Sequence, residues 1–285
     1  MNIGKTVSGR YLIKERIGSG GFGTVWLAAD NESGGYAAIK QLKHKWLRSF
    51  EMVNCFKNEF NLLKQLPHEN TIRPFELVSA NSGYLIVMEY LDGGSLSQRI
   101  RRTGVLEIET AVFITVRMLK VLNESNRLKI VHRDIKPSNI LFAGTGLETP
   151  KLGDFGLAYL SAGRICLPAQ NIHAHSQTMG TLAYMPPEQL SGKRLNIKSD
   201  IYSLGMTLYK MVAGRLPFGE GFLDSGGVKR SILHPFREHP GRYRPEIQFW
   251  LDDLIMRMIA ARIYERPGSP REVLDVIEKN MKTDG

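Results

Sequence analysis

A short polar segment between two apolar runs holds the densest set of side chains that could do chemistry. Residues 131–142 read VHRDIKPSNILF, so two basic residues, a carboxylate, a lysine and an amide lie within eight positions. A carboxylate can accept a proton, and carboxylate and amide oxygens are ligands that hard cations such as Mg²⁺ prefer. A solvated surface turn has no need of this combination, so the segment indicates a functional loop.

A second candidate is the glycine cluster near the amino terminus. Residues 18–25 read GSGGFGTV, which fits the pattern G-x-G-x-x-G-x-V. A dinucleotide site would require a helix after the glycines, whereas TVWLAA favours a strand. The loop therefore joins two strands, and its backbone N–H groups can close over phosphate oxygens because glycine has no Cβ in the way. The alternative is a plain glycine-rich hairpin.

The elements that would position these loops fall into two groups. In the first third of the chain, apolar and β-branched runs predict strands over 11–17, 24–29, 36–42 and 84–91, and a helix over 53–66. After the predicted hinge DGGSL, helical spacing dominates over 95–102, 107–125, 198–213, 247–261 and 269–282. We therefore expect an α+β protein with a small strand-rich lobe and a larger helical lobe. Ligands favour the cleft between two such lobes.

The composition limits the class of protein. The 285 residues carry a formal net charge of +10, and no apolar run reaches the roughly 18 residues of a membrane helix. Cys55 and Cys166 form neither a disulfide framework nor a zinc motif, which suits a reducing compartment. We expect a soluble, cytoplasmic protein without a membrane segment. The charge indicates either an anionic partner or a solvated basic surface.

Seven motifs, in order along the chain, resemble the protein kinase signature set. They are the glycine loop, AAIK at 37–40, HRDIKPSN at 132–139, DFG at 154–156, GTLAYMPPE at 180–188, KSDIYSLG at 198–205 and ERP at 265–267. Over residues 11–277 the chain resembles eukaryotic-like (Hanks-type) serine/threonine protein kinase catalytic domains. The resemblance implies a two-lobed kinase fold. Its small lobe would span 11–88, its hinge 89–94 and its helical lobe 95–285, after a lead of residues 1–10.

For the polar loop, the resemblance implies phosphoryl transfer, in which positioning and charge neutralisation matter more than covalent chemistry. Asp134 corresponds to the catalytic base for the substrate hydroxyl, and Lys136 to the lysine that offsets charge on the transferring phosphate. Asn139 and Asp154 correspond to ligands of Mg²⁺, for which Mn²⁺ can substitute. His132 is expected to be structural.

Lys40 corresponds to the catalytic lysine that contacts the α- and β-phosphates of ATP and needs an acidic partner on the following helix. Glu59 matches that role. Glu51 is the competing acid, but it lies near the helix start, where the helix dipole favours an acid in any case. We favour Glu59, and we expect Leu63 to face the same way and to pack toward Phe155.

The resemblance also implies an ATP site in the cleft. Apolar side chains would sandwich the adenine, one methionine would close the back of the pocket, and the hinge backbone would offer hydrogen bonds. The predicted ATP-binding residues are Gly18, Ser19, Gly20, Gly21, Phe22, Gly23, Val25, Ala38, Lys40, Glu59, Met88, Glu89, Leu91 and Leu141. For the apolar members the alternative is core packing, and the two roles are compatible.

The Lys136–Pro137 pair resembles serine/threonine rather than tyrosine kinases, and Thr181 matches a threonine of the same class. Serine and threonine hydroxyls of proteins are therefore the expected acceptors. Arg133 precedes the base, and relatives with this arginine use it to bind a phosphate on the activation segment. Thr178 and Ser176 lie nearest to the usual acceptor position, which Gln177 occupies here. We expect autophosphorylation of one of them, with a homodimer as one route.

Further matches concern structure and substrate choice. Glu188 and Arg266 match a buried ion pair, and Asp200 matches a buried aspartate that bonds the backbone of the polar loop. Kinases that select arginine-rich substrates carry acids at three positions where this chain has Ser95, Ser138 and Lys210. No preference for arginine before the acceptor is therefore expected.

Three other functions compete with an active protein kinase. A small-molecule kinase of the antibiotic or choline type shares an aspartate–asparagine loop but lacks GTLAYMPPE. A kinase-fold scaffold with weak or partner-dependent activity usually lacks the lysine, the base or the metal aspartate, and Lys40, Asp134 and Asp154 are all present. A nucleic-acid binder is suggested by charge alone, and no nucleic-acid partner is expected.

Overall fold

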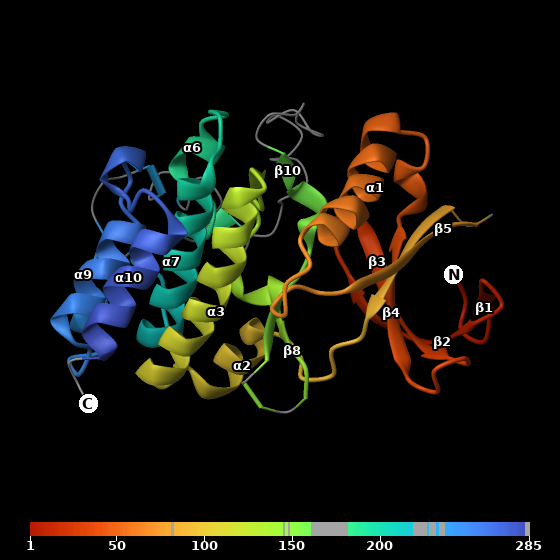
Figure 1. Cartoon of the computed structure of the whole chain (residues 1–285), viewed down its shortest axis with the longest axis horizontal. Helices are drawn as coiled ribbons and strands as arrows, with labels where there is room; N and C mark the ends of the chain where they lie inside the picture. Colours follow the sequence, from red (N-terminus) through yellow and green to blue (C-terminus); the bar gives the residue numbers. More distant parts are fainter. Residues whose placement is uncertain are drawn as a thin grey trace.

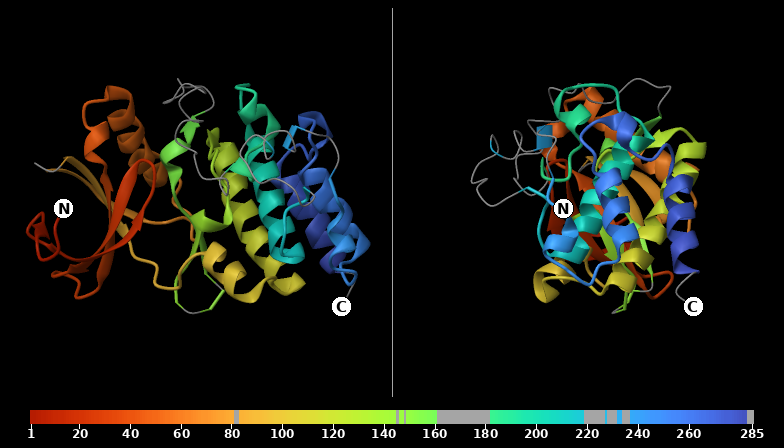
Figure 2. Two further views of the ribbon diagram at one scale, coloured as in Figure 1. Left: turned by 180° about the vertical axis from the view of Figure 1, so that it is seen from behind. Right: turned by 90° about the vertical axis from the view of Figure 1, so that its left-hand side faces the viewer.

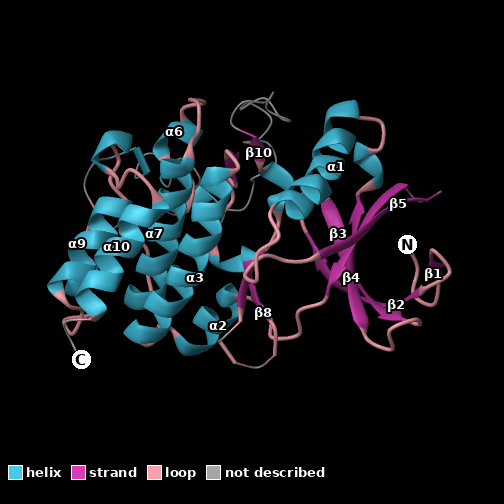
Figure 3. Ribbon diagram, viewed as in Figure 1, coloured by secondary structure: helices cyan, strands magenta, loops and turns pink. Residues whose placement is uncertain are grey.

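The computed structural model describes residues 1–80, 83–144, 146–147, 149–160, 182–218, 227, 232–233 and 237–282. Strands gather at one end of the molecule together with α1, and the remaining long helices gather at the other end (Figures 1 and 3). The view from behind shows the same two groups side by side along the long axis (Figure 2). The expected α+β, two-lobed arrangement is confirmed.

A six-stranded antiparallel sheet forms the small lobe, in the order β1-β2-β3-β4-β6-β5. Its strands are β1 (Thr6–Val7), β2 (Tyr11–Ser19), β3 (Gly23–Asp30), β4 (Tyr36–Leu42), β5 (Pro74–Ala80) and β6 (Gly83–Glu89). Alternation along β4 sends Ala37 and Ile39 into a buried cluster on one face. Ala38 and Lys40 therefore point to the opposite face, which carries the cavity described below.

Two strands of this sheet were not predicted from the sequence. β5 is an edge strand that starts at a proline, and most of its residues are only half-buried, so it lacks a clear alternation. β1 has only two residues and pairs with β2, which places part of the expected lead, residues 1–10, within the sheet. The predicted strands over 11–17, 24–29, 36–42 and 84–91 correspond to β2, β3, β4 and β6.

Helix α1 (Phe50–Gln65) packs its apolar face against the sheet. Val53, Phe56 and Phe60 form a buried cluster with Leu42 of β4 and Ile86 of β6. The helix starts three residues before the predicted position because the Ser49 side chain accepts a hydrogen bond from the Met52 N–H and caps it. This packing turns the neighbouring face of α1, which carries Glu59, toward β4.

The helical lobe is built around two long helices with many buried side chains. Its helices are α2 (Leu96–Thr103), α3 (Ile108–Arg127), α6 (Pro187–Leu190), α7 (Ile197–Ala213), α9 (Phe249–Met258) and α10 (Pro270–Met281). In α7, a Cβ added at Gly205 would lie 2.7 Å from the Met258 Cβ, so only glycine allows α9 to approach this closely. In the described parts of the chain, no helix is both long and apolar enough to cross a membrane.

The polar loop lies between two short strands at the junction of the lobes. β7 (Ile130–Val131) precedes it, and β8 (Ile140–Phe142) follows it and pairs with β9 (Pro150–Leu152). The DFG motif follows β9 and overlaps the single-turn helix η3 (Phe155–Leu157). β10 (Tyr159–Leu160) then pairs with β7. These two small sheets bring the polar loop and the DFG motif, far apart from Lys40 in sequence, under the large sheet.

Candidate active site

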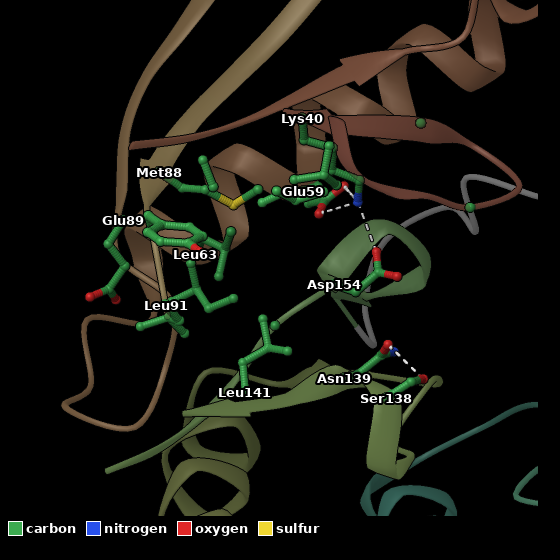
Figure 4. Close-up of a pocket in the computed structure, with 18 of the residues that line it drawn as sticks. Lys40, Glu59, Leu63, Met88, Glu89, Leu91, Ser138, Asn139, Leu141 and Asp154 are labelled. Atoms are coloured by element: carbon green, nitrogen blue, oxygen red, sulfur yellow. Dashed lines mark hydrogen bonds and ion pairs between the residues drawn. The ribbon is translucent and has the colours of Figure 1, made fainter. Parts of the chain in front are cut away.

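A cavity of about 240 Å³ lies between the large sheet on one side and the polar loop, β8 and the DFG motif on the other (Figure 4). Every predicted ATP-binding residue except Gly18 and Ser19 lines it, and those two belong to the end of β2. The metal-ligand candidates Asn139 and Asp154 line it as well. Lining residues that were not predicted to bind ATP or metal are Ile17, Leu63, Ile72, Tyr90, Ser138 and Gly153.

Lys40 stands at the back of the cavity between two carboxylates (Figure 4). Its Nζ donates to Glu59 Oε1 at 2.6 Å and Oε2 at 2.8 Å, and to Asp154 Oδ1 at 2.8 Å. The Lys40 and Glu59 side chains are almost completely buried, whereas the Asp154 side chain is 44% exposed. The predicted choice of Glu59 over Glu51 agrees with this geometry, because Glu51 lies in the first turn of α1 beside Ser49.

The Lys40 ammonium stabilises both carboxylates, whereas Glu59 and Asp154 repel each other. Burial opposes the charge on Lys40, but Asp154 and Glu59 outweigh it and raise the lysine pKa. Burial raises the pKa of Glu59, and Lys40 opposes that shift. Burial would raise the pKa of Asp154, but the nearby Lys40 opposes this effect, and the carboxyl pKa is lowered to about 2. Lys40 and Asp154 are therefore charged at neutral pH, as phosphate and metal binding require.

The DFG glycine allows this cluster to form. A Cβ on Gly156 would lie 3.2 Å from Glu59 Oε2 and 3.3 Å from Asp154 Oδ1, tighter than ordinary contacts. Asp154 itself has φ +61°, in the left-handed region that non-glycine residues seldom adopt. Such backbone persists where the surroundings hold it, here by the ion pair with Lys40.

The polar loop forms a hydrogen-bonded unit around Asp134. Lys136 Nζ lies 2.9 Å and 2.8 Å from the two carboxylate oxygens of Asp134. Asn139 Nδ2 donates to the Asp134 carbonyl at 2.8 Å and to Asp134 Oδ2 at 3.0 Å. Burial raises the pKa of Asp134, and the ammonium of Lys136 opposes that shift. The structure thus brings the predicted base, the predicted phosphate lysine and one predicted metal ligand into contact.

Asp200 holds the backbone of this loop from below. Its Oδ2 accepts from the His132 N–H at 2.8 Å, and its Oδ1 from the Arg133 N–H at 2.9 Å. Arg133 has φ +72°, so these bonds support a backbone conformation that costs about 1–3 kcal/mol. Burial raises the pKa of Asp200 to about 7, and the two N–H donors oppose that shift.

The Glu188–Arg266 pair joins α6 to the turn before α10. Arg266 Nη1 and Nη2 lie 2.8 Å and 2.9 Å from the two oxygens of Glu188. The Arg266 side chain is fully buried, and Ser199 Oγ adds a third donor to Glu188 at 2.7 Å. Burial alone would raise the pKa of Glu188. The guanidinium of Arg266 opposes this effect, and the pKa is lowered from its ordinary value.

The hinge carries a polar feature that the sequence did not reveal. The Glu89 carboxylate accepts from the Arg73 N–H at 2.6 Å and from Lys151 Nζ at 2.7 Å. Its side chain therefore ties β6 to β9, and its N–H donates to the Arg73 carbonyl at 3.0 Å. Residues 90–95 connect β6 with α2, and Ser95 caps α2.

Several predicted residues lie outside the described part of the chain. These are the phosphorylation candidates Thr178 and Ser176, together with Cys166, Gln177 and Thr181. Cys55 is described and buried on α1, as expected for a small apolar residue. Lys210, one of the three substrate-facing positions, donates its ammonium to the Gly214 carbonyl.

The buried His132 should make the stability of the fold depend on pH. Its Nε2 lies 3.2 Å from the Gly153 carbonyl, which requires an N–H there, and its Nδ1 accepts from the Asp134 N–H. Both contacts fit the neutral ring, and burial lowers the pKa of His132 to about 4 from an ordinary value of 6.5.

The unfolded chain therefore takes up a proton below pH 6.5 that the folded chain refuses until about pH 4. Stability is full above pH 6.5 and falls with pH, by about 2 kcal/mol at pH 5 for this group. Urea denaturation at pH 7 and pH 5 should show a smaller pH-dependent loss in His132→Gln than in the wild type. The exposed control His44→Gln should keep the wild-type loss, and an equal loss in both variants would exclude His132 as the cause.

Comparison with known proteins places this arrangement in a family. The family model described as the protein kinase domain matches residues 11–276. The chain is 32% identical over 285 residues to the serine/threonine-protein kinase PrkC of Bacillus subtilis, covering 99% of this chain and 42% of that protein. It is 34% identical over 275 residues to the serine/threonine-protein kinase PknA of Mycobacterium tuberculosis, covering 94% of this chain and 61% of that protein.

A third relative is the PknA protein of Corynebacterium glutamicum, 31% identical over 284 residues that cover 92% of this chain and 58% of that protein. The chain thus spans about two fifths to three fifths of the length of these relatives. The match extends across nearly the whole chain and includes every motif described above, so the chain belongs to the protein kinase domain family.

Proposed function

We propose that the chain transfers the γ-phosphoryl group of ATP to serine or threonine hydroxyls of proteins. The observation that carries this proposal is the intact Lys40–Glu59 pair with Asp154 on the same ammonium. A scaffold has no need to bury these charges together, because burying an ion pair is costly unless it is well bonded. The names of the relatives support serine/threonine specificity.

The cavity suits a nucleotide with its base at the hinge and its phosphates at the Lys40 end. Val25, Ala38 and Leu141 supply apolar walls, and Met88 lies deeper, beside Leu63 (Figure 4). Among the described residues, no protein acceptor takes the Leu91 N–H. We infer that this N–H and the Glu89 carbonyl bond the adenine edge.

The residues present suit a magnesium ion. Asn139 donates its Nδ2 to Asp134, which leaves its Oδ1 as an acceptor that the Ser138 hydroxyl contacts at 3.4 Å. Asp154 supplies a carboxylate on the cavity wall. Mg²⁺ is usually held by one or two such groups and completes its shell with water and substrate phosphates. When bound it would neutralise charge on the phosphates.

The chain's own groups then have separate tasks. Asp134 accepts the proton of the incoming hydroxyl and orients it, and Lys136, in contact with Asp134, is placed to offset charge on the transferred group. Lys40 holds the phosphates of the nucleotide, and Glu59 keeps Lys40 in place. The buried Asp200 keeps the loop backbone fixed while these groups act.

Regulation by phosphorylation on the activation segment is part of the proposal. Arg133 lies directly before the base, and its guanidinium suits a phosphate dianion. Thr178 or Ser176 is the proposed acceptor, by autophosphorylation, with a homodimer as one route. The support for this autophosphorylation is the position of Arg133, Ser176 and Thr178 in the sequence.

The intact mass of the purified chain after incubation with Mg²⁺ and ATP tests the function. Mass increments of one phosphate, on serine or threonine, are expected in the wild type and absent in Asp154→Asn. Glu109→Gln, an acidic-to-amide change in the first turn of α3, should behave as the wild type. Binding of ATP without phosphate on the chain or on added protein substrates would instead favour the scaffold.

A further inference from the structure

The tip of the glycine loop is held by a residue outside the cavity. Ser19 of β2 pairs with Thr24 of β3, and the Gly20 N–H donates to the Gly23 carbonyl at 2.9 Å. Gly21 and Phe22 therefore form the tip of this hairpin, and both line the cavity. Glycine peptides have few steric barriers, so the tip needs an external contact to keep one orientation.

Trp46 supplies such a contact. Its indole Nε1 donates to the Gly21 carbonyl at 3.1 Å, and the Lys43 N–H donates to the Phe22 carbonyl at 3.0 Å. Both donors belong to the connection between β4 and α1, where Trp46 ends the short helix η1 (His44–Trp46). Two successive carbonyls of the tip are thus drawn toward this connection.

The same tryptophan is attached to the start of α1. Its carbonyl accepts from the Ser49 N–H at 3.0 Å, and the Ser49 side chain caps α1. The Trp46 and Phe22 rings pack against a buried cluster that includes Met52 and Cys55 of α1. The loop tip is therefore linked to the helix that carries Glu59.

The direction of the carbonyl has a consequence for the cavity. In a trans peptide the N–H points opposite to the carbonyl, so the Phe22 N–H is directed away from Trp46. Gly21 and Phe22 line the cavity, whereas Trp46 does not. We propose that Trp46 is a positioning residue that holds the Gly21–Phe22 peptide with its N–H toward the phosphates of the bound nucleotide.

This inference rests on the proposed nucleotide site, so its test separates phosphate contacts from base contacts. Binding of ADP and of adenosine, each with Mg²⁺, is measured by calorimetry on the wild type and on Trp46→Phe. The variant keeps an apolar ring and loses the indole N–H. We expect ADP to bind roughly 2- to 5-fold more weakly, as for one lost hydrogen bond, with adenosine affinity unchanged.

A matched control is Trp26, which lies on β3 of the large sheet. Trp26 donates its indole Nε1 to Gln41 Oε1 at 3.3 Å and does not line the cavity, so Trp26→Phe should leave both affinities unchanged. Thermal unfolding checks that each variant folds. If Trp46→Phe does not fold, Trp46→Leu serves as the second variant.

The possible outcomes separate a failure of the proposed role of Trp46 from a failure of the proposed nucleotide site. Equal weakening of ADP and adenosine in Trp46→Phe, or no weakening of either, would overturn the role of Trp46. A wild type that binds adenosine and ADP equally well would overturn it too, because the phosphates would then make no contact. A wild type that binds neither ligand would overturn the proposed nucleotide site together with it.

Discussion

Replacing Asp134 by asparagine should lower the rate of phosphoryl transfer by about 10²- to 10⁴-fold, the usual contribution of a positioned general base. The substitution keeps the size of the side chain and one oxygen for Lys136, but removes the group that takes the proton. Asp134 is also the centre of the loop's hydrogen bonds, with Lys136 and Asn139 as donors. Steady-state kinetics with a protein substrate would measure the change.

Nucleotide binding should be nearly unaffected in Asp134→Asn, because Asp134 is not among the residues that line the cavity. Calorimetry with ADP and Mg²⁺ therefore separates a loss of chemistry from a loss of fold. Asp253→Asn is the matched control, since Asp253 lies on the surface of α9, where it pairs with Arg257. Turnover in Asp134→Asn at the rate of Asp253→Asn would rule out Asp134 as the base.

Replacing Arg266 by methionine should destabilise the fold by about 3–5 kcal/mol, the typical cost of leaving one buried charge without its partner. The methionine retains much of the apolar volume, but Glu188 loses both guanidinium donors. The lost arginine also donates to the Ala260 carbonyl and lies over the Tyr202 ring. Urea denaturation, followed by circular dichroism, would measure the free energy of unfolding.

The unpaired charge on Glu188 should account for much of the stability lost in Arg266→Met. In the double variant Glu188→Gln/Arg266→Met, the remaining amide is neutral, so the loss should be smaller than the sum of the single losses. Arg271→Met is the surface control, because Arg271 makes ion pairs with Asp275 and Glu278 on the exposed side of α10. It should unfold like the wild type. Equal stability of Arg266→Met and Arg271→Met would contradict the buried-pair argument.

Much of the fold could be predicted because its signals are local. The strand at 36–42 alternates between two faces, and β4 has these limits. The helix containing Glu59 follows from apolar spacing, and only its start was placed three residues late, because the cap at Ser49 was not used. β5 was missed because an edge strand needs no strict alternation.

The order of the motifs along the chain was enough to name the residues of the site. Lys40, Asp134, Asn139 and Asp154 are each recognisable from their immediate neighbours in sequence, since the chemistry requires particular residue types at fixed local spacing. The structure places Lys40 and Asp154 in contact although 114 positions separate them. Asp134 and Asn139 bond each other within one loop, a contact that the sequence analysis did not predict.

Other features were decided only by tertiary packing. Ile72 and Tyr90 line the cavity without belonging to a motif, because packing alone brings them there. The Glu89 carboxylate joins Lys151, and the Trp46 indole reaches Gly21, through contacts between segments that no local pattern relates. The sequence by itself determined which chemical groups are available. The tertiary structure decided which of them share a hydrogen bond, because a directed contact depends on how separate elements pack and not on the distance between residues along the chain.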